Sequence, residues 1–171
     1  PPLFAYLGRV SIEKNIEAFL ALDLPGPKLV IGDGPAREML ERRFSEVRFT
    51  GVLKGTSLVH ELNRASVLVF PSRTDTFGLV MLEAMACGVP VAAFPVTGPI
   101  DVVTPGVTGE LNENLGVAAI AALQLDRDQI REVALTRSWA NATAEFLDNL
   151  VPVKRVTTVA LHRPQASSIR A

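Results

Sequence analysis

The segment from Val67 to Phe94 narrows the possible folds of this chain more than any other. It begins with four apolar residues, VLVF, whose β-branched and aromatic content and short length fit a buried strand. Leu79 to Cys87 contains only good helix formers and apolar residues, and Gly88 after it can supply the left-handed turn that ends a helix. The run from Pro90 to Phe94 predicts a further strand, so the order is strand, loop, helix, strand.

The rest of the chain continues this alternation. It predicts an α/β protein with a Rossmann-like parallel sheet, helices on both faces and right-handed crossovers. In such sheets ligands bind at the carboxyl ends of the strands. The other expected strands are 3–7, 28–31, 47–50 and a short one near Glu110, and the other expected helices are 12–22, 36–44, 57–65, 99–103, 115–125 and 128–150.

Composition sets the broad class. With 171 residues, of which 48% are hydrophobic and 20% charged, the chain can bury the core of one globular domain, expected over residues 1–152. Net charge is −1, which gives no sign of a nucleic-acid partner. Residues 153–171 contain basic but no acidic side chains. Pro152 precedes this segment and Pro164 lies within it, so we expect a disordered basic tail. No apolar run is long enough to span a membrane, and the start resembles that of a fragment of a longer protein.

Two carboxylates flank the predicted start of this helix, which is signalled by Thr74, Asp75 and Thr76 ahead of Gly78. Asp75 lies in the loop after the strand, and Glu83 lies about one turn into the helix, with seven residues between them. The amides around Phe77, Gly78 and Leu79 are the unpaired donors of a helix amino end, which favour an anion. The simpler alternative is an ordinary helix start with two surface acids.

A second polar group follows the first strand in the sequence Gly8-Arg9-Val10-Ser11-Ile12-Glu13-Lys14-Asn15. Arg9 leaves the end of the strand and Lys14 rises from the first helical turn, for which Ser11 is a plausible N-cap. Both cations can therefore project toward the helix start at Gly78 and bind a diphosphate, Arg9 through a two-pronged guanidinium and Lys14 as a mobile charge. Two solvated surface cations are the alternative, and Glu13 is expected to make only a local ion pair.

Together the two stretches resemble the retaining glycosyltransferases of the GT-B architecture, group 1, which carry Glu, seven residues, Glu and then a small-residue run ending Gly-x-Pro-Val. This chain has Asp75 where the first Glu is usual, which shortens that side chain by one methylene. The resemblance covers 3–152 and implies the carboxyl-terminal half of such an enzyme. It implies that Asp75, Arg9 and Lys14 are catalytic, that Glu83 binds the ribose, that Gly8 and Val52 contact the nucleotide, and that the backbone of Phe77, Gly78, Leu79 and Val80 faces the donor sugar.

The function that this resemblance implies is hexosyl transfer from a nucleotide-diphosphate sugar, without metal or other cofactor, in carbohydrate or glycolipid biosynthesis. The acceptor would dock on an amino-terminal domain that this chain lacks, so the fragment alone should transfer nothing. We expect a cytoplasmic protein, and the whole enzyme could contact the inner face of a membrane. The alternative is a non-catalytic domain of the same fold that binds a nucleotide sugar or a protein partner.

Other motifs are interpreted as structural. Gly32-Asp33-Gly34 begins like a dinucleotide fingerprint, but Arg37 replaces its third glycine, so a strand-to-helix turn is favoured over NAD binding. Asp126 and Asp128 have the spacing of a metal-binding pair, yet an N-cap at Asp126 is the better interpretation. His60 and His162 have no partners at zinc-ligand spacing. Trp139 and Phe146 are expected to pack the last helix against the body of the domain.

Overall fold

The structure, a computed structural model, describes residues 1–151. Contacts divide the chain into two compact units, Pro1–Ser138 and Trp139–Ala171. The predicted disordered tail, 153–171, lies outside the described residues, and the domain boundary at residue 152 stays a prediction. Each unit is described by itself.

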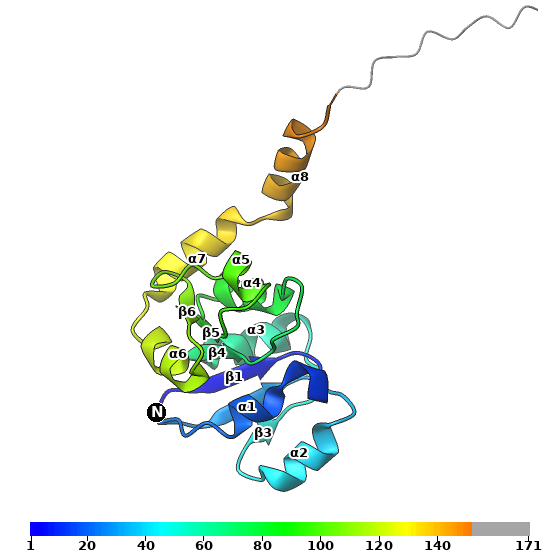
Figure 1. Ribbon diagram of the computed structural model, residues 1–171, viewed down its shortest axis with the longest axis vertical. Helices are drawn as coiled ribbons and strands as arrows, with labels where there is room; N and C mark the ends of the chain where they lie inside the picture. Colours follow the sequence, from blue (N-terminus) through cyan, green and yellow to red (C-terminus); the bar gives the residue numbers. More distant parts are fainter. Residues whose placement is uncertain (152–171) are drawn as a thin grey trace, which may run out of the picture. The chain divides into compact units, whose positions relative to one another are not determined.

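Six strands of the first unit form one parallel sheet, in the order β3-β2-β1-β4-β5-β6 (Figure 1). This is the doubly wound Rossmann order, in which the winding direction reverses between β1 and β4. The predicted fold class is therefore confirmed. The strands are β1 (Phe4–Leu7), β2 (Lys28–Ile31), β3 (Arg48–Phe49), β4 (Val67–Phe70), β5 (Val91–Ala93) and β6 (Gly109–Leu111).

Helices cover both faces of the sheet, as predicted (Figure 1). Side chains of α1, α2 and α6 pack on one face, and those of α3, α4, α5 and α7 pack on the other. The helices of this unit are the 3-10 turn η1 (Ile12–Lys14), α1 (Ile16–Leu20), α2 (Arg37–Arg43), α3 (Gly55–Arg64), α4 (Leu79–Ala86), α5 (Pro99–Val102), α6 (Leu115–Ala122) and α7 (Arg127–Thr136).

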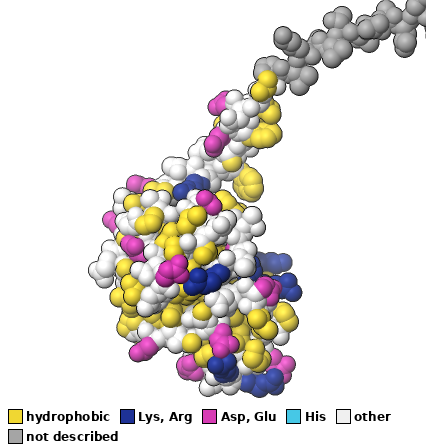
Figure 2. Space-filling view, viewed as in Figure 1, with side chains coloured by type: hydrophobic (Ala, Val, Ile, Leu, Met, Phe, Trp, Pro, Cys, Tyr) yellow, Lys and Arg dark blue, Asp and Glu magenta, His cyan; other side chains and the backbone are white. Residues whose placement is uncertain are grey.

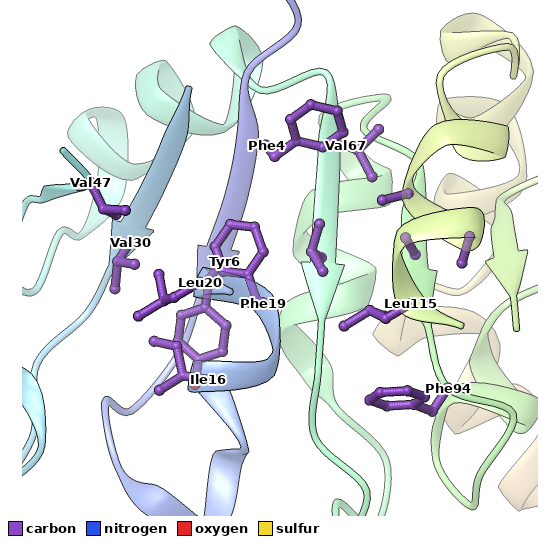
Figure 3. Close-up of a cluster of buried hydrophobic side chains, with 14 of the residues drawn as sticks. Phe4, Tyr6, Ile16, Phe19, Leu20, Val30, Val47, Val67, Phe94 and Leu115 are labelled. Carbon is purple, nitrogen blue, oxygen red and sulfur yellow. The ribbon is translucent and has the colours of Figure 1, made fainter. Parts of the chain in front are cut away.

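The two-residue period of the strands builds two cores from one sheet. In β1, Phe4 and Tyr6 enter the core under α1 and α6, whereas Ala5 and Leu7 enter the core under α3 and α4. Because both faces are buried, the strand reads as a continuous apolar run rather than an alternation. Figure 3 shows the first core, in which Phe19 of α1 lies among the side chains of β1.

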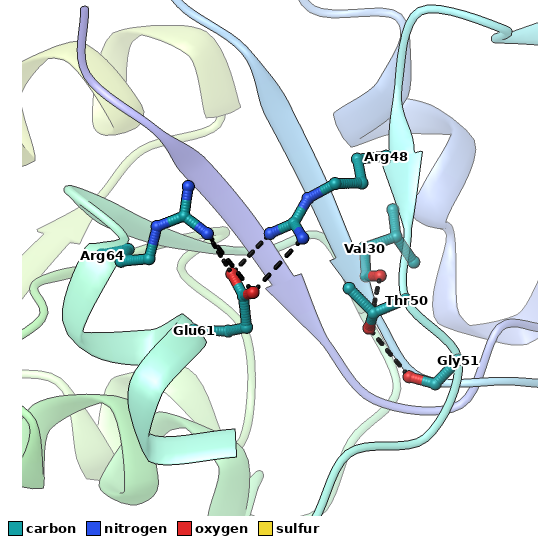
Figure 4. A network of polar contacts seen from close by, with 6 residues as sticks. All are labelled: Val30, Arg48, Thr50, Gly51, Glu61 and Arg64. Carbon is teal, nitrogen blue, oxygen red and sulfur yellow. Dashed lines mark hydrogen bonds and ion pairs between the residues drawn. The ribbon is translucent and has the colours of Figure 1, made fainter. Parts of the chain in front are cut away.

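Polar contacts fix the edge of the sheet. Arg48 of β3 and Arg64 of α3 both donate hydrogen bonds to Glu61 of α3, whose side chain is only 13% exposed (Figure 4). The hydrogen bond from Arg48, assisted by the charge of Arg64, lowers the pKa of Glu61 even though partial burial opposes ionisation. On the face seen in Figure 2, acidic and basic side chains are interspersed, in keeping with the net charge of −1.

Two predicted helices are interrupted. The helix expected over 12–22 is divided by Asn15, whose backbone is left-handed, into η1 and α1. The helix expected over 128–150 is two helices, α7 and α8 (Trp139–Asp148), because the backbone leaves the helical range at Arg137, whose guanidinium donates to the carbonyl of Val102. In the second unit, of which 139–151 are described, Trp139 is 84% exposed. Because the two units are described separately, the predicted packing of this helix against the first unit stays a prediction.

Candidate functional site

The polar residues singled out from sequence meet at the carboxyl ends of β1 and β4, where the winding of the sheet reverses. The register that pairs these strands ends at Ala5 and Leu68, two residues before each strand ends. The loops that follow β1 and β4 therefore face each other without a shared strand ladder. This is the position at which open α/β sheets bind their ligands.

An ion pair joins the two loops. Lys14 Nζ, at the end of η1, lies 2.5 Å from Asp75 Oδ1 in the loop between β4 and α4. The two side chains are 28% and 19% exposed, so the pair is partly withdrawn from solvent. The structure thus confirms that the loop after the first strand reaches the region before Gly78, and it adds a contact with Asp75 that the sequence did not reveal.

Several polar groups around this pair have no complete set of partners. Burial opposes ionisation of Asp75, but the hydrogen bond from Lys14 and the neighbouring Ser72 hydroxyl outweigh it, so the pKa of Asp75 is lowered. Asp75 Oδ2 and the hydroxyls of Ser72 and Ser11 are buried, and none makes a hydrogen bond of ordinary geometry with another described residue. Since nearly all buried polar atoms in proteins are paired, these three are candidates for a ligand or for ordered water. Ser11 stands at the N-cap position of η1, as predicted, but its side chain makes no capping hydrogen bond.

Tyr6 and Asn15 support the loop that carries the cations. The Tyr6 hydroxyl donates to the carbonyl of Arg9 at 2.7 Å, and burial together with the negative charges of Asp75 and Glu13 raises its pKa, which keeps it a neutral donor. Asn15 Nδ2 donates to the carbonyl of Pro71, the first residue after β4, at 3.0 Å. Tyr6 was not singled out from the sequence, and Asn15 was named there only as the last residue of the motif that carries Arg9 and Lys14, although an Asn inside a helical pattern is one signal of a left-handed turn.

The Gly32-Asp33-Gly34 turn after β2 has the structural role that was predicted. A Cβ on Gly32 would lie 1.8 Å from the carbonyl oxygen of Gly8, and a Cβ on Gly34 would lie 2.3 Å from that of Val10. Only glycine therefore allows this turn to pack against the loop after β1. Arg37, at the place of the third glycine, bonds to Asp33 and Glu41 instead of leaving room for a ligand.

The amino end of α4 lies beside Asp75, as expected. Gly78 is left-handed, with φ of 80°, and the backbone amides from 77 to 80 donate to no other described residue, which leaves them open to a ligand. Gly98, which precedes α5, approaches this loop so closely that a Cβ there would lie 2.7 Å from the carbonyl oxygen of Asp75. Gly98 is a site-shaping residue that the sequence did not identify, because its contact is with a loop 23 residues earlier.

The remaining predicted residues lie around this centre. The Arg9 side chain is 66% exposed, and its guanidinium forms a long ion pair, 3.9 Å, with the carboxylate of Glu13. The guanidinium is therefore held loosely, and Glu13 makes the local pair that was expected. Glu83 is exposed in α4 and makes no hydrogen bond or ion pair with another described residue. A further cation, Arg73, was missed: its guanidinium stacks 3.7 Å from the centre of the Phe94 ring and pairs with Glu113. The roles predicted for all these residues stay predictions.

An apolar hollow adjoins Arg9 at the carboxyl ends of the first three strands. Its volume is about 290 Å³. Val52, which follows β3, is 62% exposed beside it, and the backbone amide of Val52 donates to no other described residue. A flat apolar group such as a nucleobase would find both apolar contact and backbone donors here. The hollow is lined by Leu7, Gly8, Arg9, Ile31, Gly32, Asp33, Val52 and Leu53.

The remaining features of residues 1–151 concern a helix cap, metal binding and membrane spanning. The predicted N-cap at Asp126 is confirmed, because its carboxylate accepts from the amides of Asp128 and Gln129. Within this part of the chain no three His, Cys, Asp or Glu side chains are grouped as a metal site would need. No helix there has the length and apolar character to cross a bilayer.

Known proteins share both sequence and fold with this chain. The family model described as glycosyl transferases group 1 matches residues 1–126. Sulfoquinovosyl transferase SQD2 of Arabidopsis thaliana is 38% identical over 114 residues, which are 64% of this chain and 22% of the plant protein. A GDP-mannose-dependent alpha-mannosyltransferase of Mycolicibacterium smegmatis is 34% identical over 157 residues, 85% of this chain and 42% of that protein. The chain therefore spans less than half the length of these relatives.

Solved structures share the fold. A lipopolysaccharide outer core galactosyltransferase in its apo form superposes with a TM-score of 0.74 at 22% identity, over 86% of this chain and 48% of that one. The HepE protein of Anabaena in complex with UDP superposes with a TM-score of 0.66 at 22% identity, over 86% of this chain and 49% of that one. Such identities establish the fold, and the family model, which covers most of the chain, establishes the lineage. This chain belongs to the glycosyl transferases group 1 family.

Proposed function

We propose that this chain is the donor-binding, carboxyl-terminal half of a retaining glycosyltransferase that uses a nucleotide-diphosphate sugar. The acceptor would be held by an amino-terminal domain, in line with the 42% of the mannosyltransferase relative that this chain spans. The observation that carries the proposal is the Lys14–Asp75 pair at the reversal of the sheet, next to the amides that begin α4, which donate to no other described residue.

The groups at this site match the parts of such a donor in order. The hollow beside Val52 suits the nucleobase. Glu83, whose exposed carboxylate makes no hydrogen bond or ion pair with another described residue, suits the two ribose hydroxyls. Arg9 and Lys14 suit the diphosphate, together with the amides at the amino end of α4. A nucleotide ligand is supported by the solved structure of HepE, which is a complex with UDP.

In the proposed reaction the sugar leaves the diphosphate and is attacked by the acceptor on the same face. Negative charge then grows on the bridging phosphate oxygen, where Arg9, Lys14 and the α4 amides would stabilise it. Asp75 would bind a sugar hydroxyl through the oxygen that Lys14 does not occupy, Oδ2. The diphosphate itself would help to remove the acceptor proton, so the proposal requires no protein nucleophile and no metal.

Calorimetric titration of the chain with UDP, GDP and ADP, with and without Mg²⁺, tests the proposal. We expect one of the three to bind without metal. Lys14→Ala should weaken that binding about 10- to 100-fold, since it removes a charge-assisted contact, and Glu83→Ala should weaken it about tenfold. Both variants should keep the thermal midpoint within a few degrees of the parent.

Two matched controls remove similar charges away from the site. Arg42 and Glu38 form an exposed pair on α2, and the alanine variant of each should bind the nucleotide as the parent does. Equal weakening by Arg42→Ala and Lys14→Ala would contradict a specific site. No binding of any of the three nucleotides at millimolar concentration would contradict the proposal for this half of the protein.

A non-catalytic binding domain is the second candidate, and it is favoured by Asp75, which stands where the family usually has Glu. Asp75→Glu in a longer protein that includes the acceptor half separates the two. If the parent transfers no sugar and the Glu variant does, the site has lost turnover. If the parent transfers sugar and the Glu variant is slower, the site is an active enzyme adapted to the shorter side chain.

A further inference from the structure

Asn15 is the one residue other than glycine that has a positive φ within residues 1–151, at 52°. It lies between η1 and α1, directly after Lys14. Its backbone needs that conformation to separate the two helical segments, and Asn tolerates it better than most residues. Glycine would adopt this left-handed backbone conformation equally well.

The side chain of Asn15 makes a contact that glycine could not make. Its Nδ2 donates at 3.0 Å to the carbonyl of Pro71, 56 residues later in the chain. Pro71 is buried and begins the loop that carries Ser72 and Asp75. One amide therefore joins the loop that carries Lys14 to the loop that carries Asp75.

This link lies where the sheet provides none. The β1–β4 register ends at Ala5 and Leu68, so the last two residues of each strand and the loops beyond them have no ladder in common. Across that gap the structure shows two side-chain contacts, Asn15 to Pro71 and Lys14 to Asp75. The first is a neutral contact to backbone that a bound anion would leave in place, whereas the second involves the cation that the anion would attract.

We propose that Asn15 is a positioning residue, whose bond to Pro71 sets the gap between these loops and holds Lys14 where the diphosphate of the donor would bind. The assignment rests on the function proposed above. It does not give Asn15 a contact with the ligand. It predicts that Asn15 acts through Lys14 and on the phosphate part of the ligand alone.

Asn15→Gly isolates the side-chain bond, because glycine keeps the left-handed backbone and removes only the amide. The measurements are calorimetric affinities of the 171-residue chain for UDP, GDP and ADP and for the matching nucleosides without phosphate. We expect Asn15→Gly to weaken binding of the nucleoside diphosphate about 5- to 20-fold and to leave the affinity for the nucleoside unchanged. A merely structural role would weaken both ligands together.

A double-mutant cycle supplies the second readout. In a Lys14→Ala background, Asn15→Gly should cause less than a twofold further loss, since the group that it positions is already gone. Asn114→Ala, which removes the side-chain cap of α6, is the control for general destabilisation and should leave both affinities unchanged. Additive losses in the cycle would overturn the assignment.

Failure of this inference differs from failure of the proposed function. If the parent chain binds none of the three nucleoside diphosphates, the proposed function fails and the role of Asn15 fails with it. If the parent binds one of them and Asn15→Gly binds it equally tightly, the donor site stands and only the role of Asn15 is overturned.

Discussion

The two ends of the sheet differ in how their polar groups are paired. At the amino end, arginines of α7 donate hydrogen bonds to backbone carbonyls, whereas at the carboxyl end several polar atoms of the loops bond to no other described residue. Arg127 donates to the carbonyls of Ala65, Asn63 and Cys87, at the ends of α3 and α4. Arg131 donates to the carbonyl of Ala86, which also ends α4. The carbonyls at the end of a helix have no hydrogen-bond donor within the helix, and a cation near them also interacts favourably with the helix dipole.

The carboxyl end is arranged in the opposite way. There the amides that begin α4, the Ser72 hydroxyl and Asp75 Oδ2 make no hydrogen bond of ordinary geometry with another described residue. Over residues 1–151, α4 thus has its last carbonyls occupied and its first amides open. The hydrogen bonds at the amino end therefore stabilise the fold, whereas the groups at the carboxyl end are available to a ligand.

The largest predicted effect is at the carboxyl end, from Gly98→Ala. Its φ of 93° strains any other residue, and the new Cβ would lie 2.7 Å from the carbonyl oxygen of Asp75. We expect a loss of about 3 kcal/mol or more in the free energy of unfolding, measured by urea denaturation, and loss of nucleotide binding in the folded fraction.

Gly106→Ala is the matched control for this prediction. Gly106 also has a positive φ, 74°, but apart from Gly106 itself and its two chain neighbours no described residue has an atom within 4 Å of the position that its Cβ would take. The backbone strain alone should cost about 1–2 kcal/mol. Equal losses in the two variants would show that the approach of Gly98 to the Asp75 loop is unimportant.

A smaller effect is expected at the amino end, from Arg127→Ala. It leaves helix-end carbonyls without their donor, which should cost about 1–2 kcal/mol of unfolding free energy. Nucleotide affinity, measured by calorimetry, should stay within twofold of the parent because the fold at the other end is unchanged. An affinity loss of tenfold with little loss of stability would contradict the separation of the two ends.

Local sequence was enough to predict most of the first unit. The β4 bounds, Val67–Phe70, were predicted to the residue, and the stretch 79–87, predicted as helix interior, contains α4. These elements follow from composition and from the glycines that end them, which act over a few residues. The position of the site also followed, because the carboxyl ends of parallel strands share one edge of a sheet.

What the sequence did not reveal depends on distant contacts. Lys14 meets Asp75 only because β1 lies next to β4, and Asn15 leaves the helical conformation where it bonds to Pro71. The separation of α7 from α8 likewise coincides with a bond from Arg137 to Val102. The helical pattern continues through both interruptions, so periodicity alone predicts longer helices than the structure contains.

The smallest predicted effect separates the two ends by pH. The bonds at the amino end have backbone carbonyls as acceptors, which carry no charge at any pH, whereas Asp75 has a carboxyl group that titrates near pH 4 in an unfolded chain. Because the pKa of Asp75 is lowered in the folded chain, its contribution to stability is complete above the unfolded value, about 4, and is lost as the pH falls through the folded value. Asp75→Asn should therefore be less stable than the parent by about 1 kcal/mol at pH 7.

The two unfolding free energies should converge as the pH is lowered toward 3, because the parent loses the charge that the variant already lacks. The deficit of Arg127→Ala, measured over the same range, should stay constant, since the backbone carbonyls that accept its bonds are uncharged throughout. Urea denaturation of the three proteins at pH 7, 5, 4 and 3 gives both curves. A deficit of Asp75→Asn that does not depend on pH would mean that its bond to Lys14 contributes through packing, and the electrostatic contrast between the two ends would then be wrong.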